Sequence, residues 1–231
     1  MRRSLGVTAA IREVIPEWSI SGFELLALLG DIPLLIVTVG ALFLADVTGV
    51  LRPAVNEERC CSNRTMFVIA TIFGGLALVV LVKAAFSAPR PPEPLHAVSS
   101  SEYGFPSGHT MAATVTWGAL ALWVPLATRR TRVVLASAFV LLVGLSRLAL
   151  GVHYLVDVVA AVSFGVFFLV VMGWVTDRRA GPAFAVAIAI AALAVLVSGG
   201  SSRSLLALVG TVSAPFGWWV LERVGRPRQR S

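Results

Sequence analysis

Long apolar runs are the feature that most limits what this chain can fold into, because about 20 apolar residues are enough to cross a bilayer as a helix. Such runs lie at roughly 23–46, 66–88, 109–127, 133–151, 154–175, 182–198 and 204–222. The last two are short and separated only by the segment SGGSSR, so they form either two spans or one hairpin that does not fully cross. We therefore predict an all-α, polytopic membrane bundle of six to seven transmembrane helices.

Composition favours one membrane domain without a second soluble domain. Hydrophobic residues make up 57% of the 231 and charged residues only 13%, whereas about a quarter of a soluble domain is charged. The apolar runs predict an integral membrane domain over 23–222 and a basic tail over 223–231. Residues 1–22 form an amino-terminal tail with apolar residues at helical spacing, so it is either a short helix on the membrane surface or unstructured. Charged residues and Pro16 interrupt this tail, and we expect no secretory signal there.

The net charge of +7 predicts orientation rather than a nucleic-acid partner, because basic residues in membrane proteins chiefly mark the cytoplasmic loops. Four segments would share one face of a seven-span bundle, and their basic residues are Arg52, Arg59, Arg64, Arg129, Arg130, Arg132, Arg178, Arg179, Arg223, Arg226, Arg228 and Arg230. We expect this face to be cytoplasmic. The loop 89–108 and the turn 147–153 then lie on the extracytoplasmic face of the cell membrane.

The first cluster of polar residues on the expected outer face contains Lys83 and Arg90. Arg90 follows Lys83 by seven positions, about two helical turns, so both cations share a face if the helix continues that far. Pro91 and Pro92 then end it. By itself the cluster is equally typical of a lysine and an arginine that extend their charges to the membrane surface.

The second cluster is the segment FPSGHT, immediately before an apolar run. Ser107 and Gly108 open a helix amino terminus, where free N–H groups and the helix dipole favour an anion. His109 adds a proton donor or acceptor that works near neutral pH. The alternative for Ser107 is a helix cap without a chemical role.

The third cluster is the segment SRLALGVHYLVD. If residues 153 onward are helical, His153 and Asp157 face the same way, and the carboxylate can hold one imidazole N–H. The other ring nitrogen is then presented as a nucleophile. The alternative is a histidine and an aspartate that satisfy each other in a polar pocket. Arg147, six residues before His153, adds a third cation.

Together the three clusters bring three cations, two histidines, a carboxylate and a helix amino terminus to one end of a membrane domain. Three positive charges around a small space favour a dense anion such as phosphate. Phosphoryl transfer needs in-line attack, charge neutralisation and a proton for the leaving oxygen. Each requirement has a candidate residue here, so we expect a hydrolase that needs no metal and no cofactor.

The three motifs resemble those of the type 2 phosphatidic acid phosphatase family, the membrane branch of a superfamily that also contains vanadium haloperoxidases. The family's motifs are a lysine, six residues and Arg-Pro; then Pro-Ser-Gly-His; then Ser-Arg, five residues, His, three residues and Asp. The matching residues are Lys83, Arg90 and Pro91; Pro106, Ser107, Gly108 and His109; and Ser146, Arg147, His153 and Asp157.

The resemblance implies a role for each matched residue. His153 would be the nucleophile that forms a phosphohistidine, held by Asp157, and His109 the general acid. The phosphate oxygens would be bound by Lys83, Arg90, Ser107, Gly108 and Arg147. The family usually has a six-helix core with three helices before the end of the first motif, whereas this chain has two clear spans there and an extra pair after the third motif.

The resemblance also implies a lipid phosphate substrate from the bilayer. Outward placement favours a polyprenyl pyrophosphate, and general phospholipid phosphatase activity is almost as well supported. Two alternatives are a phosphatase of a soluble sugar phosphate, similar to glucose-6-phosphatase, and a non-enzymatic transporter or anion-binding protein. A transporter would need polar residues along a path through the membrane, whereas here they gather at one end. We expect Asp31 to mark a kink rather than a substrate gate, and we assign no role to Cys60 and Cys61.

Overall fold

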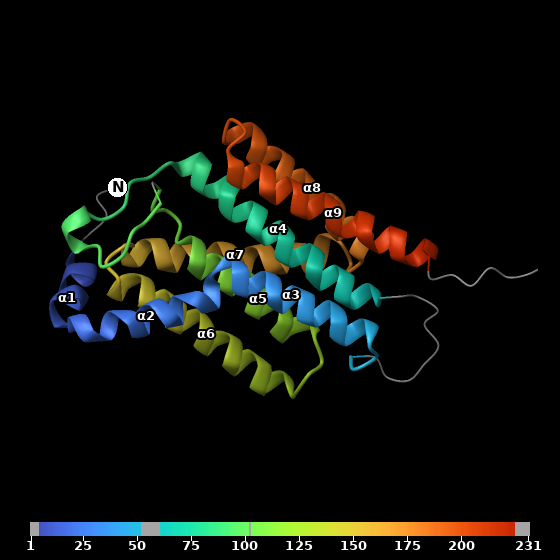
Figure 1. Ribbon diagram of the computed structural model, residues 1–231, viewed down its shortest axis with the longest axis horizontal. Helices are drawn as coiled ribbons and strands as arrows, with labels where there is room; N and C mark the ends of the chain where they lie inside the picture. Colours follow the sequence, from blue (N-terminus) through green and yellow to red (C-terminus); the bar gives the residue numbers. More distant parts are fainter. Residues whose placement is uncertain (1–4, 52–60, 102, 225–231) are drawn as a thin grey trace, which may run out of the picture.

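The computed structural model describes residues 5–51, 61–101 and 103–224. These residues form α-helices and short 3-10 turns and contain no strand. The helices are α1 Gly6–Val14, α2 Ile20–Ala27, α3 Ile32–Val47, α4 Asn63–Phe86, α5 Gly108–Trp123, α6 Arg129–Ala149, α7 Leu155–Val175, α8 Ala180–Val197 and α9 Ser202–Val224. Figure 1 shows them as an elongated bundle, so the predicted all-α fold is confirmed.

Five helices are long and apolar enough to cross a membrane: α4, α6, α7, α8 and α9. A sixth span is available if the pair Glu17–Gly30 and Ile32–Val47, bent by 45° at its break, counts as one. The kink expected at Asp31 is this break. Asp31 is the N-cap of α3, and its carboxylate accepts a hydrogen bond from the Ile32 N–H at 2.9 Å.

The span predicted over 109–127 is shorter than expected. Helix α5 has 16 residues and ends at Trp123, which leaves it outside the group of helices with a full spanning length. Val124 has an extended backbone (φ −100°, ψ 121°) because Pro125 follows it, and the residue before a proline is sterically pushed out of the helical region. Helix α5 packs against α4, α6 and α7 and carries many buried residues, so it is an internal helix of the bundle.

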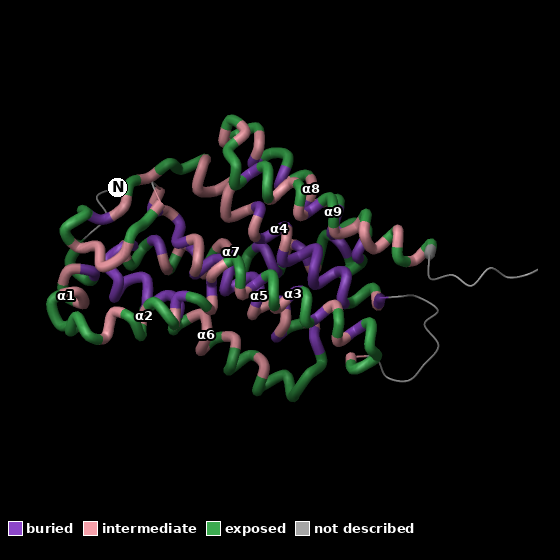
Figure 2. Tube along the Cα trace, in the orientation of Figure 1, coloured by how far each residue is buried: buried purple, intermediate pink, exposed green. Residues whose placement is uncertain are grey.

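The core lies along α4, which is the most buried of the candidate spans and packs chiefly against α8. Small residues bring the two helices together: a Cβ added at Gly74 would lie 3.1 Å from the Cβ of Ala187. Close approach through small side chains is typical of helix pairs in membranes. Figure 2 shows buried residues concentrated in the middle of the bundle and exposed ones along its outer helices.

The loops gather at the two ends of the bundle (Figure 1). One end carries α1, the segment 87–107, the turn 150–154 and the turn between α8 and α9. The other end carries the basic residues expected on one face, namely Arg64, Arg129, Arg130, Arg132, Arg178, Arg179 and Arg223. Arg52, Arg59, Cys60 and the tail 225–231 lie outside the described residues.

Within the amino-terminal tail, Gly6–Val14 form helix α1. Helix α1 packs against α6, and its Thr8 is fully buried. The Thr8 hydroxyl donates to the backbone carbonyl of His153 at 3.0 Å. The segment therefore contacts the turn that carries His153 directly.

Candidate active site

The turn that joins α6 to α7 places His153. Gly151 has a left-handed backbone (φ 72°), and a Cβ there would collide with the Leu95 carbonyl, so only glycine fits. The Ala97 N–H donates to the Leu150 carbonyl at 3.0 Å and ties the turn to the segment 87–107. The sequence motif thus fixes a tight turn between two helices.

His153 and Asp157 meet as predicted, although by a different local structure. Helix α7 begins at Leu155, so His153 precedes the helix instead of lying in it. Its Nδ1 lies 3.4 Å from Asp157 Oδ2, and the same oxygen accepts from the Tyr154 N–H at 2.9 Å. Both side chains are buried, with exposures of 1% and 0%. The carboxylate therefore caps the helix and holds the imidazole at once.

Arg90 faces the other nitrogen of the same imidazole. Its Nη1 lies 3.1 Å from His153 Nε2 and donates to the Val152 carbonyl at 2.7 Å. Its remaining nitrogens donate to the Ser101 carbonyl and, at 2.8 Å, to the Ser101 hydroxyl. The contacts assign the Nδ1 hydrogen to the Asp157 side and leave the Nε2 lone pair directed at the guanidinium.

The surroundings keep His153 uncharged. Burial, together with the positive charges of Arg90, Lys83 and Arg147, lowers the pKa of His153 well below its usual 6.5. Burial also lowers the pKa of Arg90 from its usual value, while the charge of Asp157 acts in the opposite direction. At neutral pH the site therefore combines a neutral imidazole with a charged guanidinium.

Lys83 and Arg90 do not share a helical face, contrary to the sequence expectation. Helix α4 ends at Phe86 because Ser87 adopts a left-handed conformation (φ 42°), and Arg90 arrives from the loop that follows. Lys83 remains in the last turn, and its Nζ donates to the Tyr103 carbonyl at 2.9 Å. The two cations reach one site by separate routes.

The second motif lies beside Lys83. A Cβ at Gly108 would lie 3.0 Å from Lys83 Cε, so glycine leaves room for the lysine. Ser107 occupies the N-cap position of α5, but its hydroxyl pairs with the Thr110 hydroxyl at 2.9 Å and makes no capping bond. The Ser107 N–H donates to the Asp157 carbonyl at 3.0 Å, which joins the second and third motifs.

His109 has a partner that the sequence did not predict. Its Nε2 lies 3.8 Å from Asp31 Oδ1, with side-chain exposures of 34% and 41%. Gly30 makes this approach possible, because a Cβ there would collide with the His109 carbonyl. Asp31 therefore marks the kink, as expected, and also places a carboxylate beside the predicted general acid.

Arg147 projects from the last turn of α6 into the same end of the bundle. It is only 6% exposed, and its Nε is buried without a hydrogen-bond partner among the described residues. An orphaned buried guanidinium N–H is costly unless something binds it. An anion held between Arg147, Arg90 and Lys83 would satisfy it.

Sequence reasoning missed two further residues at this end. Thr8, whose hydroxyl holds the His153 carbonyl, is separated from it by 145 positions and belongs to no motif. Arg203, at the start of α9, lies close enough for its charge to lower the pKa of Arg90.

Comparisons with known proteins match the same region. A sequence profile described as the PAP2 superfamily matches residues 64–181, a range that includes all eight predicted site residues. Phosphatidylglycerophosphatase B of Bacillus subtilis (strain 168) is 37% identical over a stretch that covers 32% of this chain and 40% of that protein, well under half of its length. The crystal structure of a transmembrane PAP2 type phosphatidylglycerolphosphate phosphatase from Bacillus subtilis shares the fold, with a TM-score of 0.62 and 20% identity, covering 75% of this chain and 84% of that one.

Proposed function

Because the chain belongs to the PAP2 superfamily, whose profile covers about half of it, we propose that it is a membrane phosphatase that hydrolyses a lipid phosphate. The observation that carries the proposal is the alignment of Asp157, His153 and Arg90. The carboxylate holds one imidazole nitrogen at 3.4 Å, and the other nitrogen lies 3.1 Å from the guanidinium. A phosphate bound to Arg90 would stand directly in front of a nitrogen lone pair.

The proposed reaction proceeds in two steps through a phosphohistidine. Nε2 of His153 attacks phosphorus in line with the leaving oxygen, so that the N–P bond forms as the P–O bond breaks. His109 gives its proton to the leaving oxygen. Water then attacks phosphorus, His109 takes a proton from it, and the N–P bond breaks to release inorganic phosphate. Asp157 stabilises the positive charge that His153 acquires in the first step.

The remaining residues of the proposed site would supply the positive charge and further hydrogen-bond donors. Lys83, Arg90 and Arg147 come from three different segments and would neutralise the equatorial phosphate oxygens. Gly108 and Ser107 at the start of α5 would add backbone and hydroxyl donors. Burial and the charge of Arg147 lower the pKa of His109 to about 4, and Asp31, 3.8 Å away, acts in the opposite direction. The negative charge of a bound phosphate would act in the same direction as Asp31 and favour the protonated imidazole that a proton donor requires. With the charge supplied by side chains, the proposed reaction needs no metal.

Membrane-spanning helices around the site favour a substrate with its acyl or prenyl chains in the bilayer. The curated relative's name, phosphatidylglycerophosphatase B, supports a phosphatidylglycerol phosphate as the first substrate to test. Polyprenyl pyrophosphates are the second, since release of a terminal phosphate demands the same chemistry. Hydrolysis of these two substrates differs only in the leaving group.

Phosphate release by the purified protein in detergent tests the function. We expect turnover of phosphatidylglycerol phosphate, phosphatidic acid or a polyprenyl pyrophosphate that persists in excess EDTA, with inhibition by vanadate, which would occupy the phosphate site. A soluble sugar phosphate in the same panel separates a lipid phosphatase from a sugar phosphatase. Turnover that disappears with EDTA and returns with Mg²⁺ would contradict the proposed charge stabilisation.

His109→Ala should show a defect that depends on the leaving group. Loss of a general acid costs ~10²–10⁴-fold when the leaving oxygen needs a proton, so we expect a loss in this range on a lipid phosphate. On p-nitrophenyl phosphate, whose leaving group departs unprotonated, the loss should be far smaller. Comparing kcat of the two substrates measures this, and His96→Ala, a histidine bonded to the Pro91 carbonyl, is the control. Equal defects on both substrates would assign His109 to phosphate binding.

We propose that the site opens to the extracytoplasmic side, on the basis of the arginines at the opposite end of the bundle. In a variant with both native cysteines changed to serine, a membrane-impermeant maleimide added to intact cells should label Ser99→Cys and leave Arg130→Cys unlabelled. Both positions are exposed, at opposite ends. Labelling only at position 130 would reverse the orientation and leave the chemistry unaffected.

A further inference from the structure

The end of the bundle opposite the proposed active site contains a pocket of about 470 Å³. Its walls come from the start of α4, the end of α5, the start of α6 and the turn between α7 and α8. Pockets of this size are typical of small-molecule sites. Neither the motifs nor the proposed reaction uses any residue of this pocket.

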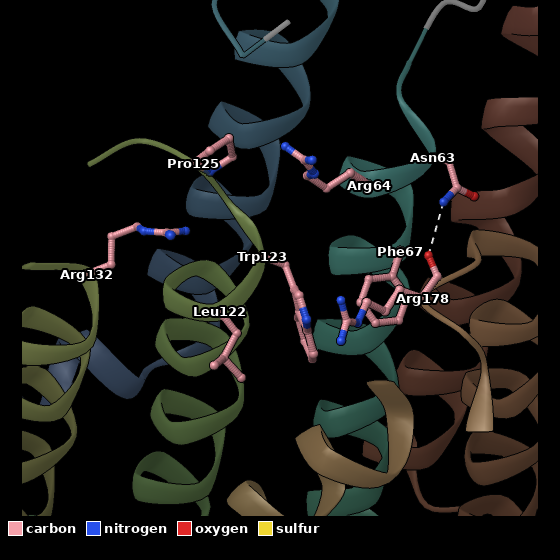
Figure 3. Close-up of a pocket in the computed structure, with 8 residues that line it drawn as sticks. All are labelled: Asn63, Arg64, Phe67, Leu122, Trp123, Pro125, Arg132 and Arg178. Carbon is pink, nitrogen blue, oxygen red and sulfur yellow. Dashed lines mark hydrogen bonds between the residues drawn. The ribbon is translucent and has the colours of Figure 1, made fainter. Parts of the chain in front are cut away.

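Three arginines from three separate segments line it: Arg64, Arg132 and Arg178. In Figure 3, Arg64 and Arg132 extend toward each other from opposite sides, and the Arg178 guanidinium lies beside Trp123. The described residues that line it include no carboxylate. Among the described residues the ion pairs are His109–Asp31 and His153–Asp157, so none of the carboxylates in that part of the chain forms an ion pair with the three guanidinium groups.

Hydrogen bonds hold the side chain of Arg132 and the backbone of Arg178 in place. Arg132 donates to the Val124 carbonyl, while its Nε is buried without a partner among the described residues. Asn63 fixes the turn that carries Arg178: its amide donates to the Arg178 carbonyl at 3.1 Å and its Oδ1 accepts from the Ala180 N–H at 3.0 Å. A buried N–H left without a partner is costly, so this pocket is arranged for a ligand that accepts hydrogen bonds.

The start of helix α6 adds to the positive potential. Helices α4 and α6 both begin here; the Ser62 hydroxyl accepts from the Thr65 N–H, and the Thr128 hydroxyl accepts from the Thr131 N–H. At α4 the Asp46 carboxylate accepts from the Ser62 N–H and hydroxyl at 2.7 and 2.8 Å and offsets part of the charge of that helix end. The amino termini of helices carry partial positive charge and favour anions. Together with three guanidinium groups that can each bind two oxygens, they suit a phosphate group.

We propose that this pocket binds the phosphate group of an anionic membrane lipid. Its position where spanning helices begin places it at the level of lipid headgroups. Trp123 and Phe67, packed edge to face at a centroid distance of 4.8 Å, give the pocket an apolar wall beside the arginines. Tryptophan is typical of this membrane depth. The same arginines would also accept free phosphate, and the test separates the two sources.

Thermal unfolding of the purified protein in neutral detergent, titrated with phosphatidylglycerol or with inorganic phosphate, gives an apparent Kd for each probe. The variant Arg64→Gln/Arg178→Gln removes two exposed guanidinium groups from the pocket. Arg129→Gln/Arg130→Gln, with the same charge change at the same end but outside the pocket, is the matched control. We expect the first variant to bind phosphatidylglycerol about 100-fold more weakly, roughly tenfold per arginine, and the control to change by less than about fivefold.

Each outcome decides the proposal. Stabilisation by phosphatidylglycerol but not by inorganic phosphate identifies the lipid source. Stabilisation by inorganic phosphate alone, lost in Arg64→Gln/Arg178→Gln, identifies a free anion. Equal affinities of the two double variants for every probe would overturn the site and leave only diffuse surface charge. Arg64→Lys/Arg178→Lys, which keeps the charge and loses the paired donors, should fall between wild type and the glutamine variant. Because the experiment measures binding, its result tests this proposal independently of phosphatase activity.

Discussion

His153→Ala is expected to abolish phosphate release and any acid-labile phosphoenzyme. The imidazole is buried, neutral at pH 7 and aligned between Asp157 and Arg90, so its Nε2 is the one nitrogen placed to attack a phosphate held by the guanidinium. Without it the first step has no nucleophile. Turnover should fall to the background of the assay, measured on a lipid phosphate, and rapid quenching should trap no phosphorylated protein.

Two controls keep this result interpretable. His153→Gln keeps a polar side chain in the buried site and should be equally inactive, which separates lost chemistry from a packing defect. His96→Ala, in the neighbouring loop, should retain turnover. If His153→Ala folded normally, by thermal unfolding, and still turned over at the wild-type rate, the proposed nucleophile would be wrong.

Asp157→Asn is expected to keep the fold and lose about 10⁴-fold in kcat, as in other carboxylate–histidine pairs. An asparagine oxygen can still accept from the Tyr154 N–H, so the cap of α7 survives. An amide oxygen, however, cannot stabilise the positive charge that His153 acquires, and an amide N–H in its place would select the wrong tautomer. The measurement is kcat on one lipid phosphate together with the unfolding midpoint.

The matched control for the carboxylate is Asp177→Asn, an exposed aspartate at the opposite end of the bundle. It carries the same change in charge and should leave kcat unchanged. A loss of less than about tenfold in Asp157→Asn would show that the carboxylate is structural, since an orienting partner of a nucleophilic histidine contributes several kcal/mol to the barrier.

Local spacing explains why much of the site could be predicted from the sequence. His153 and Asp157 are four residues apart, so one helical turn or one capping turn brings them together, and the structure uses the second. Ser107 and Gly108 are neighbours in the sequence, and the prediction that they open a helix amino terminus matches the start of α5. The apolar runs likewise predicted α4, α6 and α7, because a membrane span needs only length and hydrophobicity.

Contacts between distant segments could not be predicted in this way. Asp31 reaches His109 only because the chain breaks between η2 (Leu28–Gly30) and α3, and because Gly30 lets two backbones approach. Arg90 reaches His153 through an irregular loop, although the sequence suggested a continuous helix from Lys83. Tertiary packing determines which distant residues meet, and the local spacing of residues in the sequence does not indicate these contacts.

The hydrogen bond from Thr8 to the His153 carbonyl has a practical consequence for protein engineering. An affinity tag or deletion at the amino terminus acts next to the proposed reaction centre, because Thr8 of α1 holds the backbone carbonyl of the proposed nucleophile, His153. Helix α9 ends at the opposite end of the bundle (Figure 1), where a fusion leaves that turn untouched. Activities of differently tagged preparations are therefore comparable only when the tag is at the carboxyl end.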